Sequence, residues 1–143
     1  MTVKADVAPG VLADFEAANA SMLPDDLHGP GWVATFTGVP TILVNLDALG
    51  ARGLAEPESW EDLTDPAYAG LVGLGRIGVS GSATWAFVAM NLAAGGTIDD
   101  WQPGIDYGRR LLPNLTQAAS LDTFERGEVP ISVRYDFNQA PWF

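Results

Sequence analysis

Apolar and polar positions along this chain follow two different spacings, and these spacings predict its helices and strands. Apolar side chains that recur every three or four positions are typical of helices with one buried face. They predict longer helices over residues 5–19, residues 82–94 and Ile98–Leu112. Short apolar and β-branched runs indicate strands at residues 32–36, 41–45, 71–75, 115–118 and 129–135. Because strands alternate with helices, the sequence predicts an α/β layered domain.

Residues that favour helix ends predict the shorter helical segments. Ser120 is a good N-cap and Gly127 a good stop, which indicates a short helix over residues 120–126. Asp62 follows Ser59 by three positions, as in a weak capping box, so a capped turn is expected there. A further short helix is expected over residues 46–51.

Small hydroxyl residues and a glycine lie where the helix over residues 82–94 begins. The first N–H groups of a helix have no internal partners, and the helix dipole places partial positive charge there. Glycine lets a ligand approach the backbone, so this turn can bind a carboxylate, phosphate or phosphonate. The alternative is that Ser80 or Ser82 only caps the helix. The turn comprises Ser80, Gly81, Ser82, Ala83 and Thr84.

Length and charge narrow the range of functions. The chain has 143 residues, one domain's worth, and its 48% hydrophobic content is enough for a core. The formal charge of −11 argues against a nucleic-acid partner, which needs a basic face. The same charge can favour a cationic ligand, or it can simply keep the protein soluble. No apolar run reaches the roughly 20 residues that span a bilayer.

No arrangement typical of catalysis, of a metal site or of a cofactor site is found in the sequence. His28 is the single histidine and there is no cysteine, so the ligands of most transition-metal sites are missing. The residues around Ser80 do not fit the glycine-flanked elbow of a nucleophilic serine. The acidic residues lack calcium-loop spacing. We therefore predict no enzyme activity, no cofactor and no metal.

Several phrases of the sequence are similar to one family of transport proteins. Residues 60–70 read Trp-Glu-Asp-Leu-Thr-Asp-Pro-Ala-Tyr-Ala-Gly, which resembles a motif of the type II periplasmic solute-binding proteins of ABC importers. The resemblance is to their iron, polyamine and phosphonate group. Further similar phrases lie at residues 41–45, 112–115 and 127–133, in matching order, and the likeness covers residues 5–140.

This resemblance implies a particular fold and domain organisation. Members have two α/β lobes joined by crossing strands, with the ligand in the cleft between them. The chain then contains a single three-layer lobe with a mixed sheet flanked by helices. Residues 32–143 would run from hinge strand to hinge strand, and residues 1–31 would be a remnant of the other lobe. A full member is about twice as long, so a fragment, an excised domain or a natural half-protein is expected.

The resemblance also implies which residues contact the solute. The second lobe contributes the turn at residues 80–84 and hinge residues, here Thr37, Tyr135 and Asp136. Tyr135 can stack or donate a hydrogen bond. Asp136 can hold an ammonium group, or it can be a turn residue that bonds the backbone. The run after the last strand has no pair of adjacent tyrosines, which argues against ferric iron.

Two functional hypotheses follow. The first is the solute-binding component of an ABC importer, periplasmic or extracellular, that binds a small polar or charged solute and docks on a permease. The alternative is a self-associating structural or scaffold domain that reuses the fold. The apolar face of the helix at residues 5–19 would lack its packing partners, so we also predict a homodimer, by domain swapping if the hinge strands exchange.

Overall fold

The structure is a computed structural model, and it describes residues 18–140. Two compact units divide the chain between Thr37 and Gly38. The sequence placed the boundary earlier, between residues 31 and 32, and the origin of the first unit in another lobe stays a prediction. The helix expected over residues 5–19 lies almost wholly outside the described residues. Each unit is described by itself.

The first unit, as far as it is described, is a small antiparallel hairpin preceded by two 3₁₀ turns. Strands β1 (His28–Gly29) and β2 (Trp32–Val33) pair through a turn in which Gly31 has a φ of 74°. The Trp32 ring lies against Gly29, where a Cβ atom would come within 2.4 Å of the indole nitrogen. The strand predicted over residues 32–36 is wrong beyond Val33, because residues 34–37 have no regular structure.

The second unit is built on a four-stranded mixed sheet in the order β3-β6-β4-β5. Strands β4, β5 and β6 are parallel, and β3 lies antiparallel to β6 at one edge. The register pairs Val72 with Ile131 and Pro40 with Tyr135. Their bounds are Pro40–Val44 for β3, Val72–Leu74 for β4, Leu115–Thr116 for β5 and Ile131–Tyr135 for β6.

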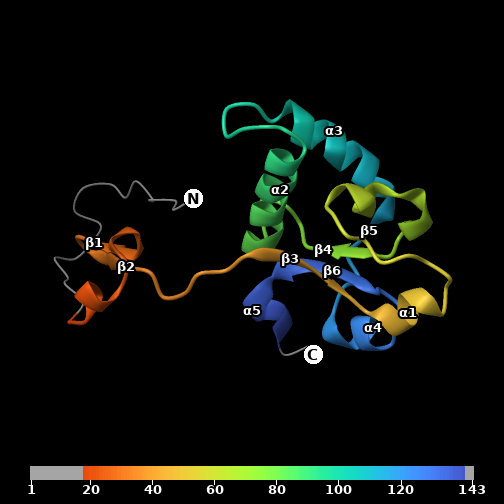
Figure 1. Cartoon of the computed structure of the whole chain (residues 1–143), viewed down its shortest axis with the longest axis horizontal. Helices are drawn as coiled ribbons and strands as arrows, with labels where there is room; N and C mark the ends of the chain where they lie inside the picture. Colours follow the sequence, from red (N-terminus) through yellow and green to blue (C-terminus); the bar gives the residue numbers. More distant parts are fainter. Residues whose placement is uncertain (1–17, 141–143) are drawn as a thin grey trace. The chain divides into compact units, whose positions relative to one another are not determined.

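Helices cover both faces of this sheet, which confirms the predicted mixed α/β fold. Figure 1 shows α2 and α3 on one face, and α4 and α5 on the other. Ser120 caps α4 in a capping box with Thr123, and Gly127 follows with a φ of 71°, as the sequence predicted. The bounds are Leu46–Gly50 for α1, Gly81–Ala93 for α2, Gln102–Leu111 for α3, Leu121–Glu125 for α4 and Asp136–Gln139 for α5.

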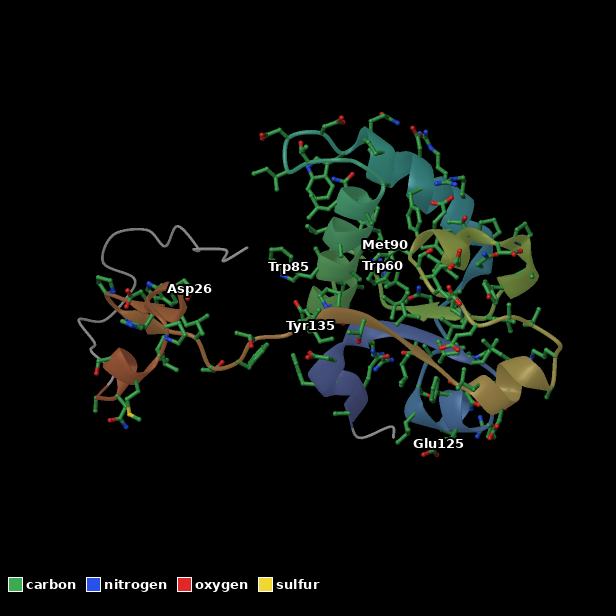
Figure 2. The ribbon with its side chains drawn as sticks, viewed as in Figure 1. Asp26, Trp60, Trp85, Met90, Glu125 and Tyr135 are labelled. Carbon is green, nitrogen blue, oxygen red and sulfur yellow. The ribbon has the colours of Figure 1, made fainter. Side chains whose placement is uncertain are left out.

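The core lies between the sheet and the helices α2 and α3. Met90 is 1% exposed, and Trp60 packs against the same cluster, beside α2 in Figure 2. Buried side chains that share this core include Leu63, Tyr68, Val72, Ala86, Leu111 and Ile131.

The predicted buried face of α3 is wrong. The series chosen from the sequence ran through Ile98, Trp101, Ile105, Gly108 and Leu112. Three of these side chains, Ile98, Ile105 and Leu112, are 57%, 41% and 67% exposed, and Trp101 and Gly108 are half-buried. The buried positions of α3 are Gly104, Tyr107 and Leu111. Tyr107 lies on the inner face, because its ring packs in the core and its hydroxyl donates a hydrogen bond to the Trp60 carbonyl. The spacing chosen from the sequence was out of phase, since it included Gly108 and Leu112 and left out Gly104, Tyr107 and Leu111.

Candidate functional site

The carboxyl ends of the parallel strands meet at one edge of the sheet, and this edge is the candidate site. The chain leaving β4 rises to α2 on one face, whereas the chains leaving β5 and β6 run to α4 and α5 on the other (Figure 1). Ligands of open α/β sheets bind in the crevice where successive connections part to opposite faces. The topology therefore selects the loop between β4 and α2.

The backbone of this loop is fixed by short-range hydrogen bonds. The amides of Val79 and Ser80 both donate to the Arg76 carbonyl, at 3.1 and 2.8 Å. Gly78 has a φ of 81°, a conformation that favours glycine. These bonds and the positive φ of Gly78 place Ser80 at the start of α2.

Ser80 is the N-cap of α2. A capping role for Ser80 or Ser82 was the alternative to ligand binding in the sequence analysis. Its Oγ accepts from the Ala83 amide at 3.4 Å and lies 3.2 Å from Ser82 Oγ. Thr84 has a structural role as well. Its hydroxyl donates to the Ser80 carbonyl at 2.8 Å and accepts from the Gly78 amide at 2.9 Å. Thr84 thus ties the loop to the helix.

The amides of Gly81 and Ser82 are the groups of this turn best placed to receive a ligand. The first amides of a helix have no carbonyl of their own helix to donate to. Gly81 is exposed, and a Cβ atom built on Gly78 or Gly81 would meet nothing within 4 Å. The helix start is therefore open rather than covered by the lobe's own side chains.

The predicted hinge residues separate into two groups. Tyr135, at the end of β6 (Figure 2), stacks on Phe137 with ring centroids 5.3 Å apart, and burial raises the pKa of its hydroxyl. Asp136 is exposed, and its Oδ1 accepts from the Val39 amide at 3.1 Å. Thr37 is exposed and belongs to the other unit. The structure therefore brings Tyr135 and Asp136 to the edge of the sheet.

Two polar residues of this edge were missed in the sequence. Arg76 is exposed between β4 and the turn. Gln117 follows β5, and its Nε2 donates to the Leu74 carbonyl at 3.0 Å. Arg134, the next-to-last residue of β6, donates to the Ala119 carbonyl at 2.8 Å. The signal that finds these residues is their place directly after, or at the end of, a parallel strand.

Neither a metal-binding cluster nor a membrane-spanning helix is found among the described residues. Within residues 18–140, no group of three or more His, Cys, Asp or Glu residues is arranged to hold a metal ion. Within the same residues, no helix has both the length and the apolar character needed to cross a bilayer.

Comparison with known protein families identifies the chain. The model of the bacterial extracellular solute-binding protein family matches residues 3–142. The chain belongs to this family. The resemblance drawn from the sequence phrases is thereby confirmed, and members of the family are solute-binding proteins. No curated protein sequence matches the chain significantly.

Solved structures of solute-binding proteins share this fold. The periplasmic binding protein AfuA from Actinobacillus pleuropneumoniae, solved with fructose-6-phosphate, has a TM-score of 0.70 at 24% identity over 88% of this chain. An ABC transporter structure from Clostridium perfringens gives 0.64 at 20% identity over 93%. The periplasmic binding protein P5PA gives 0.54 at 24% identity over 68%.

The chain spans less than half of these structures. It covers 42% of the AfuA chain, 45% of the Clostridium perfringens chain and 32% of the P5PA chain. Because the sequence identities are only 20–24%, the likeness to these structures shows a shared fold.

Proposed function

We propose that this chain is part of the solute-binding component of an ABC importer, and that its Ser80–Thr84 turn binds the anionic group of a small solute. The observation that carries the proposal is the open start of α2, at the switch point of the sheet, in a member of a solute-binding family. In the whole protein, two lobes would close over the solute and dock on a permease outside the cytoplasm. No chemical step is proposed.

The local charge favours an anion even though the chain as a whole is acidic. The open amides of Gly81 and Ser82 lie at the positive end of the α2 dipole. Arg76 lies in the loop that leads to them, and Arg134 is the next-to-last residue of β6 at the same edge. Within the described turn itself, residues 75–84 carry no acidic side chain. A phosphate group fits these features best, and a structural neighbour was solved with fructose-6-phosphate.

A titration followed by NMR tests the proposal on the 143-residue chain. Because the chain spans less than half of its structural neighbours, we expect millimolar affinity, on the order of −4 kcal/mol. Fructose-6-phosphate should shift the amide signals of Gly81 and Ser82, and fructose should not. Arg76→Gln should weaken the binding of the phosphate, whereas Arg109→Gln, an exposed arginine on α3, should leave it unchanged.

Two outcomes would contradict this function. If fructose-6-phosphate changed only the NMR signals of residues away from the Ser80–Thr84 turn, the turn would not be the binding site. Binding of spermidine but not of the sugar phosphate would replace the anion by a cation and return Asp136 to the list of ligand residues.

The predicted homodimer stays a prediction. Neither the family match nor the structural neighbours support the alternative of a self-associating scaffold. Size-exclusion chromatography with light scattering measures the mass in solution directly. A single peak at twice 15.1 kDa is the predicted result, and a single peak at the monomer mass would rule the homodimer out.

A further inference from the structure

The segment that leads into β3 is bonded twice to the segment that leaves β6. The Val39 amide donates to Asp136 Oδ1 at 3.1 Å, and the Asp136 amide donates to the Val39 carbonyl at 2.9 Å. One rung further into the sheet, Pro40 pairs with Tyr135. The side chain of Asp136 therefore extends the antiparallel pairing of β3 and β6 at the point where the regular ladder ends.

Aromatic side chains pack at the same junction between the segment that leads into β3 and the segment that leaves β6. Tyr135 and Phe137 stack with an interplanar angle of 21°, and Gly38 lies against both rings. A Cβ atom at position 38 would come within 2.6 Å of the Phe137 ring and 3.1 Å of the Tyr135 ring. Glycine is needed at this position because it leaves room for the stack.

The far end of α5 is also fixed to β3. Gln139 is 2% exposed, and its Nε2 donates to Thr41 Oγ1 at 2.7 Å and to the Thr41 carbonyl at 3.3 Å. Helix α5 is thus bonded to the β3 segment through its first residue and its last. The short helix cannot swing away from the sheet without breaking both sets of bonds.

We propose that these contacts form a clamp, residues Gly38–Thr41 with Tyr135–Gln139, in which Asp136 is a positioning residue. The proposal rests on the solute-binding function and adds to it a division of roles. Asp136 uses its Oδ1 to hold two chain segments together, whereas the Ser80–Thr84 turn binds the solute in the proposed function.

Amide hydrogen exchange measured by NMR on the full 143-residue chain, without any solute, tests the clamp. After correction for intrinsic rates, the amides of Val39 and Asp136 should exchange at least about tenfold more slowly than those of Thr35 and Thr37, which have no regular structure. Equal rates in the unmodified protein would overturn the proposal without the need for any variant.

Variants of Asp136 separate the hydrogen bond from the charge. Asp136→Ala removes the acceptor and should speed the exchange of Val39 about tenfold. Asp136→Asn keeps an acceptor oxygen without the charge, and should keep Val39 within about threefold of the unmodified rate. Asp106→Ala, an exposed acid on α3, is the matched control and should change nothing at Val39.

The results have distinct meanings. No change at Val39 in Asp136→Ala, or equal acceleration in Asp136→Asn and Asp136→Ala, would overturn the clamp. Since no solute is present, failure of the sugar phosphate to bind would leave this result intact, and failure of the clamp would leave the phosphate titration intact.

Discussion

The two ends of helix α2 use similar residues for opposite purposes. At its carboxyl end, Asn91 is completely buried, and its side chain bonds to the backbone of the loop that follows and of α3. Its Nδ2 donates to the carbonyls of Thr97 and Asp100, at 2.9 and 3.2 Å, and its Oδ1 accepts from the Gly104 amide at 2.8 Å. Gly96 and Gly104 lie so close to this side chain that a Cβ atom would come within 2.2 and 2.5 Å of Asn91 Oδ1.

At its amino end, glycine and small polar residues leave space instead. A Cβ atom at Gly78 or Gly81 would meet nothing within 4 Å, and the hydroxyls of Ser80 and Thr84 bond to the backbone of the loop and of the first helical turn. The comparison teaches that a glycine beside a polar side chain has no fixed meaning in a sequence. It marks close packing at one end of α2 and access for a ligand at the other.

The strongest test of this contrast is to remove the amide at the closed end. Asn91→Ala removes the partner of the Gly104 amide and of the Thr97 carbonyl, whereas the Asp100 carbonyl still accepts from the Thr97 amide. We therefore expect the free energy of unfolding to fall by about 3 kcal/mol. Urea denaturation followed by circular dichroism measures it. Asn138→Ala is the matched control, because Asn138 is exposed, and it should cost less than about 0.5 kcal/mol.

The two glycines offer a direct comparison between the ends. Gly104→Ala forces a methyl group against Asn91 and should destabilise the protein by about 2 kcal/mol. Gly81→Ala meets nothing and replaces glycine by a better helix former, so it should be neutral or stabilise the protein by about 0.5 kcal/mol. Equal losses in the two variants, measured by the same denaturation, would mean that the amino end is as tightly packed as the carboxyl end.

Within the open end, the two serines should differ. Ser80→Ala removes the cap of α2 and should cost about 1 kcal/mol of stability. Ser82→Ala removes only a hydroxyl that lies 3.2 Å from Ser80 Oγ, and should cost less than about 0.5 kcal/mol. Thermal unfolding of both variants checks this order, and the reverse order would assign the cap to Ser82.

Local sequence signals predicted most of the fold, because they depend on neighbours along the chain. The strand at residues 41–45, the start of α2 after Ser80 and the capped helix after Ser120 all follow from spacing and end residues. The inward face of α3 was missed because its burial is decided by Asn91 and Trp60, which are remote in sequence.

The candidate site was only partly predictable for a similar reason. The Ser80–Thr84 turn has a local pattern, so it was found. Arg76 and Gln117 come together only through the order of the strands in the sheet, which a single sequence does not contain. The bond of Asp136 to Val39 joins positions that are 97 residues apart.

A smaller effect on stability is expected at the turn of residues 58–62. Its backbone amides bond to the charged side chain of Asp62, whereas α2 is capped by the neutral Ser80. Asp62 accepts from the amides of Glu58 and Ser59 at 2.9 and 2.8 Å, and the bond from Glu58 is the main reason that its pKa lies below the ordinary value. A lowered pKa in the folded state stabilises the protein above the unfolded carboxyl value, about 4, and the benefit is lost as the pH falls through the folded value.

Acid titration should therefore affect the two caps differently. Between pH 6 and 3, after correction for the pH dependence of intrinsic exchange, the protection of the Glu58 and Ser59 amides should fall. The protection of the Ala83 amide, which Ser80 caps, should follow only the global stability. In Asp62→Asn the acid-induced change at Glu58 and Ser59 should vanish. Persistence of that change in Asp62→Asn would assign it to another carboxylate.

The pairing of Pro40 with Tyr135 places the first and last strands of the lobe on neighbouring positions of one ladder. A module whose entry and exit lie side by side can be inserted into a surface loop of a host protein with little disturbance to either fold. The same geometry makes the lobe a natural candidate for circular permutation, with new ends opened in an exposed loop such as residues 51–53.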